Sequence, residues 1–291
     1  MSQLRTCAGE YVTGCNIWRG TLDHAGGSCV GKLPMFKRHL RVAHAALLLL
    51  VLPFAGHAAS TNCPSLFQGG KAPDLIDTSL AERTTTICYN AYSMDASGVT
   101  KGPLWSAEHL TAEQIADAGN ISRTDSFHAE TGIPVADRSE LADYKGSGYD
   151  RGHMTPAGDE PDATSQKQSF SLANMVPQSH VLNTGKWERI ETTVRNMATS
   201  DGEVYVVTGP AFDGPTPDTI GADAVVVPNY TWKAIYDASK GGAAAWECTN
   251  VDVPTCEVVS VQSIIDETGI DPFPSLSASV KSHPISLPLP N

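Results

Sequence analysis

The chain has 291 residues, of which 41% are hydrophobic, which excludes a disordered protein and suffices for the core of one large domain or two small ones. Its 32 acidic residues outnumber 20 lysines and arginines, giving a net charge of −12. This balance disfavours a protein that holds nucleic acid over a broad basic surface, because phosphate neutralisation dominates such binding.

Residues 35–58 predict a secretory signal peptide. They read MFKRHLRVAHAALLLLVLPFAGHA, with three basic residues before an apolar run over residues 45–55 and a small-residue exit. The apolar run is shorter than the ~20 residues that cross a bilayer as a helix. We therefore expect cleavage after Ala58 and a secreted or periplasmic protein without a membrane anchor, with an uncleaved signal anchor as the alternative.

Residues 1–34 stand upstream of this signal and show no apolar periodicity. Functional sequence is not expected ahead of a signal peptide, and Met35 is a natural start. We interpret residues 1–34 as a leader without function, from a start codon assigned too early.

Four of the seven cysteines lie after the signal, and export makes two disulfides the expected arrangement. Three pairings are possible, and proximity in the sequence favours Cys63–Cys88 and Cys248–Cys256. No pair has the C-x-x-C spacing, so a zinc site is disfavoured.

Charge is unevenly distributed in the exported part. Residues 1–58 hold six of the basic and two of the acidic residues, which leaves 14 basic and 30 acidic residues and a net charge of −16. Eight of those 14 cations fall between Arg123 and Arg195. A local basic region on an otherwise acidic surface suits a soluble exported enzyme that turns over, rather than a protein that holds nucleic acid tightly.

The elements that follow predict one α+β domain over residues 60–280. Residues 84–96 are β-branched and aromatic, which predicts a strand, and residues 106–118 begin with a serine N-cap and continue with helical spacing. Residues 202–212 and 223–238 predict strands broken by Gly and Pro turns. Residues 260–280 predict a short helix that ends at Gly269, and the Pro-rich residues 281–291 predict a loose tail.

The stretch YDRGHMTPAGD, residues 149–159, concentrates two acids, an arginine, a histidine and two glycines. A structural interpretation makes Asp150 and Arg151 a surface ion pair and Gly152 a turn residue. The functional interpretation makes the stretch a strand-to-loop corner, in which Gly152 gives the backbone conformational freedom beside a reactive His153.

Residues 179–202 predict an amphipathic helix with functional groups on a partly buried face. Asn183, Trp187, Glu191 and Arg195 step by four residues, so they share one broad face. Glu191 and Arg195 are also spaced for an i,i+4 ion pair.

Three ordered blocks, DRGH (residues 150–153), LANMVPQ (residues 172–178) and LNTGKWERIETTVR (residues 182–195), resemble the DNA/RNA non-specific endonuclease family. The resemblance continues into VYVVTGPAF and TGIDPFPSL and covers most of residues 84–277. It implies a ββα-metal, or His-Me finger, nuclease fold with mixed antiparallel sheets, flanking helices and a single domain.

The resemblance implies a role for each matching residue. His153 is the general base that activates water, with an unperturbed pKa of ~6.5 suiting that role. Asn183 is the single protein ligand of Mg²⁺, for which Mn²⁺ is expected to substitute, and Glu191 holds metal-bound water. Arg123 stabilises the transition state, with Arg138 as the competing candidate.

The resemblance gives four further residues supporting roles. Asn174 shapes the loop of the catalytic histidine, while Arg151 and Arg195 contact phosphate. Asp150 is expected to orient the loop rather than bind the metal. Among the remaining histidines, His180 is the best candidate for a minor role, because it lies three residues before Asn183.

The implied activity is Mg²⁺-dependent hydrolysis of phosphodiester bonds in DNA and RNA that leaves 5′-phosphates. Because no recognition helix or base-reading side chains are found, we expect broad substrate choice without a ranking of RNA, DNA or strandedness. A degenerate family member that binds nucleic acid without cutting it is the alternative, and a homodimer, which some members form, is left open.

Overall fold

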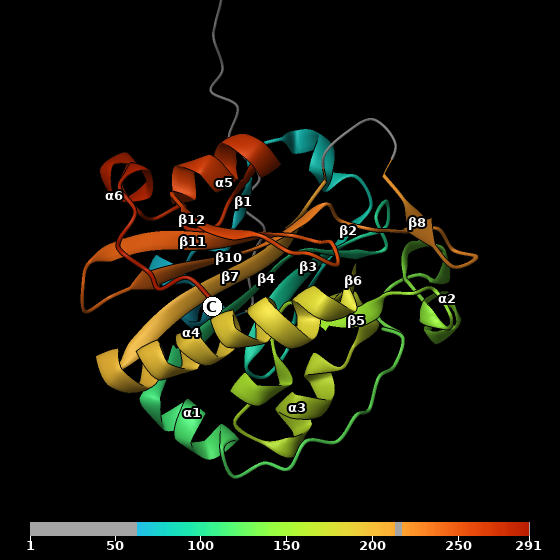
Figure 1. Cartoon of the computed structure of the whole chain (residues 1–291), viewed down its shortest axis with the longest axis horizontal. Helices are drawn as coiled ribbons and strands as arrows, with labels where there is room; N and C mark the ends of the chain where they lie inside the picture. Colours follow the sequence, from blue (N-terminus) through green and yellow to red (C-terminus); the bar gives the residue numbers. More distant parts are fainter. Residues whose placement is uncertain (1–62, 213–216, 291) are drawn as a thin grey trace, which may run out of the picture. The chain divides into compact units, whose positions relative to one another are not determined.

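The computed structural model describes residues 63–212 and 217–290, so the leader and signal peptide lie outside the described residues. A seven-stranded antiparallel sheet runs through the molecule in the order β12-β11-β10-β7-β4-β3-β2 (Figure 1). Its strands are β2 (Thr84–Cys88), β3 (Tyr92–Ser97), β4 (Gly102–Thr111), β7 (Glu203–Ala211), β10 (Tyr230–Asp237), β11 (Gly242–Thr249) and β12 (Cys256–Val259).

The remaining strands form two-stranded pairs: β1 (Asp74–Leu75) with β13 (Ile270–Asp271), β5 (Asp150–His153) with β6 (Met175–Gln178), and β8 (Thr219–Ile220) with β9 (Val225–Val226). The helices are α1 (Ala112–Ala118), α2 (Leu141–Tyr144), α3 (Ala163–Ser169), α4 (Glu188–Asp201), α5 (Val261–Thr268) and α6 (Ala278–Ser282). A π-helical turn, η7 (Leu182–Trp187), leads directly into α4, and the 3-10 turns are Pro64–Leu66, Gln68–Gly70, Thr78–Ala81, Val135–Asp137, Ala157–Asp159 and Leu172–Asn174.

Apolar side chains of the central strands point alternately to the two faces of the sheet, and both faces are buried. Val206 and Ile235 join the core under α4, whereas their neighbours Val207 and Ala234 join the core under α5. Because successive strand residues point to opposite faces, this pattern requires a layer on each side of the sheet. Figure 1 shows α4 crossing the sheet, and its apolar stripe of Ile190, Val194 and Ala198 is buried there.

The site is built on a compact ββα unit formed by β5, β6 and α4. Strand β5 pairs antiparallel with β6, so that Gly152 lies opposite Val176. A Cβ added at Gly152 would lie 2.3 Å from Oε1 and 2.6 Å from Cβ of the fully buried Gln178. Gly152 also has no left-handed φ. The expected backbone freedom at Gly152 is therefore wrong, and the glycine is required by close packing against β6.

Two expected elements are each divided in the structure. Residues 84–96 form a hairpin of β2 and β3, because the chain turns at residues 89–91. Residues 106–111 continue β4, and the helix α1 begins only after Thr111. Thr111 accepts from the backbone of Gln114 while the Gln114 side chain accepts from the backbone N–H of Thr111, a capping box that fixes the start of α1.

The strands expected at residues 202–212 and 223–238 are confirmed as β7, β9 and β10. The helix expected to end at Gly269 is also confirmed, since α5 ends there and Gly269 has a φ of 69°. A left-handed residue at this position is the usual reason for a glycine after a helix.

The C-terminal segment differs from the expected loose tail. Leu287 is buried in the core under α4, and Trp246 donates from Nε1 to the carbonyl of Pro288 at 2.8 Å. The backbone N–H of Ile285 donates to the carbonyl of Ala243 at 3.1 Å. Composition suggested a free end, but these contacts fix residues 285–288 against β11.

Two disulfides link Cys63 to Cys88 and Cys248 to Cys256. These are the pairings that proximity in the sequence favoured. The first ties the N-terminal end of the described chain to β2, and the second joins neighbouring positions of β11 and β12.

Candidate active site

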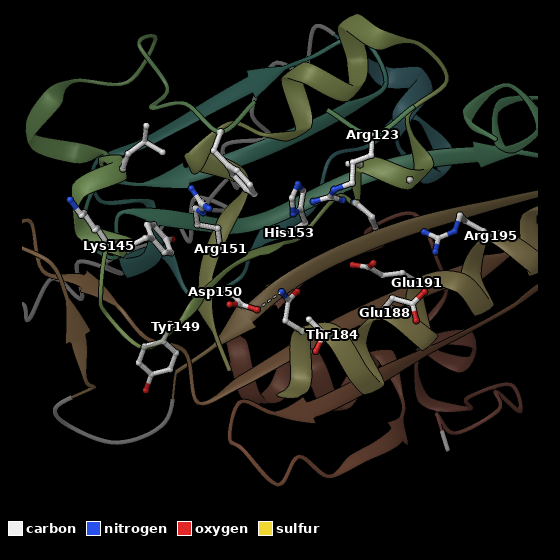
Figure 2. Close-up of a pocket in the computed structure, with 17 residues that line it drawn as sticks. Arg123, Lys145, Tyr149, Asp150, Arg151, His153, Thr184, Glu188, Glu191 and Arg195 are labelled. Atoms are coloured by element: carbon white, nitrogen blue, oxygen red, sulfur yellow. Dashed lines mark hydrogen bonds between the residues drawn. The ribbon is translucent and has the colours of Figure 1, made fainter. Parts of the chain in front are cut away.

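A cavity of about 840 Å³ opens between the ββα unit and the segments that precede it (Figure 2). Cationic and acidic side chains meet across it, from elements far apart in the sequence. Its lining comprises Arg123, Phe127, Leu141, Tyr144, Lys145, Tyr149, Asp150, Arg151, His153, Pro156, Ala157, Gly158, Asn183, Thr184, Glu188, Glu191 and Arg195.

His153 ends strand β5 and lies in the middle of this cavity (Figure 2). Its ring packs against Phe127 and Phe170, with centroid distances of 5.7 and 5.0 Å. Nε2 is buried and has no hydrogen-bond partner within the described part of the chain. Burial and the nearby Arg123 and Arg151 lower the pKa of the imidazole to about 3, well below the expected ~6.5. The ring is therefore neutral at physiological pH, with the lone pair of either Nε2 or Nδ1 unprotonated, according to the tautomer.

The cavity distinguishes the two candidate arginines upstream of the motif. Arg123 lines the cavity and lies 5.0 Å from the centre of the Phe170 ring. Arg138 does not line it, since its guanidinium pairs with Glu140 at 2.8 Å and donates to the carbonyls of Glu130 and Ile133. The geometry therefore favours Arg123 over Arg138 as the group that meets a ligand.

Asp150 and Asn183 connect strand β5 to the π-helical turn. Asn183 donates from Nδ2 to Asp150 Oδ2 at 2.9 Å, the interaction drawn as a dashed line at Asp150 in Figure 2. The exposed His180 places Nδ1 2.8 Å from the same oxygen. Because its amide nitrogen is engaged by Asp150, Asn183 keeps its side-chain oxygen for another partner. Asp150 thus orients Asn183 rather than the loop alone.

Helix α4 brings Glu188, Glu191 and Arg195 to the same cavity. The expected Glu191–Arg195 pair is replaced by a different one, because Arg195 donates from Nη1 to the buried Asp159 at 2.8 Å and from Nη2 to Thr192 at 2.7 Å. Burial raises the pKa of the Glu191 carboxyl to about 7, although Lys233 acts to lower it.

Of the three residues at four-residue spacing from Asn183 to Glu191, only the first and the last face the cavity. Trp187 is fully buried and donates from Nε1 to the carbonyl of His153 at 3.4 Å, while Asn183 and Glu191 line the cavity. Trp187 therefore belongs to the core and supports the backbone at His153.

Asn174, expected near the site, is fully buried and does not line the cavity. It accepts from the backbone N–H of Thr155 at 3.0 Å and donates to the carbonyls of Thr155 and Ser169, both at 2.9 Å. Its side-chain nitrogen and oxygen are thus both engaged in fixing the chain two residues after His153, an arrangement that suits the expected role of shaping the histidine loop.

A buried charged layer beneath the cavity was not foreseen from the sequence. Lys233, from the middle of β10, donates from Nζ to the carbonyl of Met154 at 3.1 Å and to Thr208 at 2.6 Å. Two buried acids, Glu108 and Asp159, lie near enough for Lys233 to oppose the rise that burial causes in their pKa. A single lysine in the apolar run of β10 is the one local signal that could have revealed this layer.

The residues present fit a hard divalent cation. The cavity combines the Asn183 amide oxygen with the carboxylates of Glu188 and Glu191, which are the donor types that Mg²⁺ prefers. In the ranges 63–212 and 217–290, no group of three or more His, Cys, Asp or Glu side chains is arranged to hold a metal ion. The same ranges contain no helix long and apolar enough to cross a membrane.

Comparison with known proteins identifies what the chain is similar to. A family model described as DNA/RNA non-specific endonuclease matches residues 74–279. Nuclease C1 of Cunninghamella echinulata var. echinulata is 37% identical over 53% of this chain and 59% of its own length. Mitochondrial endonuclease G of Bos taurus is 32% identical over 67% of this chain and 68% of its own, so this chain spans about three fifths to two thirds of these relatives.

Among solved structures, a complex of EndoG with EndoGI is similar at a TM-score of 0.60 and 26% identity. The match covers 67% of this chain and 88% of that chain. This similarity, together with the antiparallel sheets and the ββα unit, confirms the expected α+β nuclease fold in a single domain.

Proposed function

The chain belongs to the DNA/RNA non-specific endonuclease family, and we propose that it cuts phosphodiester bonds of DNA and RNA within the cavity around His153, leaving 5′-phosphates. The observation that carries the proposal is the placement of a neutral His153, whose Nε2 has no hydrogen-bond partner among the described residues, between cationic and acidic side chains in one cavity. A neutral imidazole beside cations combines a proton acceptor with groups that attract phosphate.

His153 would act as the general base that takes a proton from water attacking the phosphorus. Arg123 and Arg151, whose charges already act on His153, would hold the phosphate and oppose the charge that develops on it. These cations disfavour a protonated His153, so they also preserve its basic form before the substrate binds.

Asn183 would be the protein ligand of Mg²⁺, with Mn²⁺ as a substitute, and the ion when bound would stabilise negative charge on the phosphorane and the leaving oxygen. Asp150 would hold the Asn183 amide by its nitrogen and so direct the oxygen toward the ion. Glu191 would accept hydrogen bonds from water around the ion. Arg195, fixed by Asp159, would contact phosphate from the other side of the cavity.

The experiment that tests this function is incubation of the purified protein with supercoiled plasmid and with a mixed RNA, each with Mg²⁺ and with EDTA. We expect open circles, then linear fragments and shortened RNA with Mg²⁺, and intact substrates with EDTA. Full cleavage in EDTA would contradict the metal requirement. Retarded migration of the plasmid without cleavage would instead support the alternative of a binding protein that does not cut.

The pH dependence of the cleavage rate should reflect the titration of the Glu191 carboxyl rather than that of the His153 imidazole. The raised pKa of about 7 makes the Glu191 carboxylate the major form only above about pH 7, whereas His153 is already neutral there. We expect kcat/KM to increase as pH increases through about 7 and then to level off. In Glu191→Gln the remaining activity should lose this increase between pH 5.5 and 8, and an unchanged profile would assign the increase to another group.

We also propose that the protein is exported and processed after Ala58. The two disulfides support an oxidising compartment, although the endonuclease G relative is named as mitochondrial. Intact-mass spectrometry of the protein secreted by its own cells should give a chain that begins at Ala59 and carries no free thiol. A chain that retains residues 1–34, or four titratable thiols, would contradict export as proposed.

A further inference from the structure

The cavity extends beyond the groups that the proposed reaction uses. At one end lie Lys145 and Tyr149, at the other Arg123 and Arg195, with His153 between them (Figure 2). Leu141 and Tyr144 also line the first end, which is formed by α2 and the turn after it. None of these four residues of the first end has a part in the chemistry, so their exposure to the cavity requires another explanation.

The first end presents apolar and aromatic surface beside positive charge. Leu141 is 45% exposed and lies on the wall of the cavity. Tyr149 is half-buried and packs on the cluster that contains Tyr144 and Leu172, so its ring is held in place. The exposed ammonium of Lys145 stands beside them.

The turn between Lys145 and Tyr149 is built to hold both side chains at the cavity. Gly146 and Gly148 have φ values of 72° and 86°, in the region that other residues rarely adopt. Ser147 accepts through Oγ from the backbone N–H of Tyr149 at 3.1 Å and donates to the carbonyl of Tyr144 at 3.0 Å. The turn is therefore fixed by its own hydrogen bonds.

Two further features of this end suit a nucleobase. The Arg151 guanidinium lies 3.8 Å from the centre of the Phe127 ring, an arrangement that extends a flat stacked surface toward the cavity. Tyr144 is only 6% exposed, and its hydroxyl has no hydrogen-bond partner in the described ranges. Because the hydroxyl oxygen is itself buried, it becomes available to a polar edge of a bound base only when binding opens this wall of the cavity.

We propose that Leu141, Lys145 and Tyr149 form a subsite for an unpaired nucleobase next to the cleaved phosphodiester, so that single-stranded nucleic acid is cut in preference to duplex. This inference rests on the proposed function. The base face stacks on Tyr149 and Leu141, and Lys145 holds the adjoining phosphate, a combination that tolerates every base because each has a π-face. In a duplex both faces of a base are covered by its neighbours, so the base has to leave the stack before it enters the subsite.

The test compares cleavage of one oligonucleotide sequence in single-stranded and fully paired form. Wild-type protein should cut the single strand with a kcat/KM on the order of tenfold higher. Tyr149→Ala should lower the single-strand value by on the order of tenfold and leave the duplex value nearly unchanged, whereas Tyr149→Phe should keep the preference. Lys145→Ala should weaken single-strand binding, and Phe212→Ala and Lys71→Ala are the matched controls outside the cavity.

A binding measurement separates this subsite from the chemistry. In the His153→Ala background with Mg²⁺, a single strand carrying 2-aminopurine should lose fluorescence when its reporter base stacks on the protein. Adding the Tyr149→Ala substitution should restore the fluorescence.

Equal cleavage rates on the single-stranded and paired forms, or a preference that survives Tyr149→Ala, would overturn the subsite. Wild-type protein that cuts neither form would overturn the proposed function, and the fluorescence result would still decide the subsite. If Tyr149→Ala fails to fold, the strand preference of Lys145→Ala is compared with that of the wild-type protein instead.

Discussion

His153→Ala should lower kcat by at least ~10²–10⁴-fold, the usual effect of removing a general base. Nucleic-acid affinity should stay nearly unchanged, because Arg123, Arg151 and Arg195 remain at the cavity. Single-turnover cleavage and a separate titration of binding, both with Mg²⁺, measure the two quantities. His283→Ala provides the control, since His283 is exposed and hydrogen-bonded to the carbonyl of Ser279 away from the cavity.

The surroundings of His153 sharpen this test. The ring fills a space between Phe127 and Phe170, so its removal leaves a gap in which free imidazole should restore part of the rate. Normal turnover with poor binding would make His153 a substrate contact. Cleavage by His153→Ala at the wild-type rate would return the DRGH segment to a purely structural role.

Asn183→Ala should reduce activity at fixed Mg²⁺ by at least ~10–100-fold, since even partners behind a ligand contribute that much to metal affinity or activity. The physical reason is the loss of the amide oxygen that Asp150 holds in place through the amide nitrogen. Activity measured against Mg²⁺ concentration, and Mn²⁺ binding followed by electron paramagnetic resonance, should both shift to higher concentration. Asn196→Ala, an exposed position on the same helix, is the matched control.

Two outcomes would contradict the role of Asn183. One is Mn²⁺ binding that is unchanged in the variant, which would place the ion on other atoms. The other is a variant that melts well below wild type, which would make its loss of activity a folding effect. Asp150→Ala extends the test, because it removes the acceptor and leaves the Asn183 amide free to rotate.

The sequence predicted those parts of the site whose functional residues lie close together along the chain. DRGH and the segment from Asn183 to Arg195 each supply several groups within a few residues, so a linear pattern can find them. The structure then brought His153, Asn183, Glu191 and Arg195 to one cavity. The single-domain α+β fold and the disulfide pairs were likewise predicted, the latter because each pair is close in the sequence.

What the sequence did not predict depends on contacts between distant segments. Arg195 pairs with Asp159 rather than with its helical neighbour Glu191, and Lys233 reaches Met154 from a strand 79 residues away. The burial of Trp187 agrees with its expected place in the core, but the π-helical turn at residues 182–187 is a change in helix geometry that no periodicity reveals. The lowered pKa of His153 has the same origin, since it depends on burial and on cations brought in by folding.

The close fit of Gly152 against Gln178 has a consequence for how related sequences are able to diverge. The two positions stand on paired strands, and an added Cβ at 152 would meet the Cβ of residue 178 at 2.6 Å, so a side chain at 152 becomes possible only if residue 178 is also glycine or the strands move apart. Single substitutions at 152 meet a steric barrier that a paired change avoids. Descendants of this protein should therefore keep glycine at 152 unless residue 178 has already lost its side chain, and a library that varies both positions at once tests this order of change.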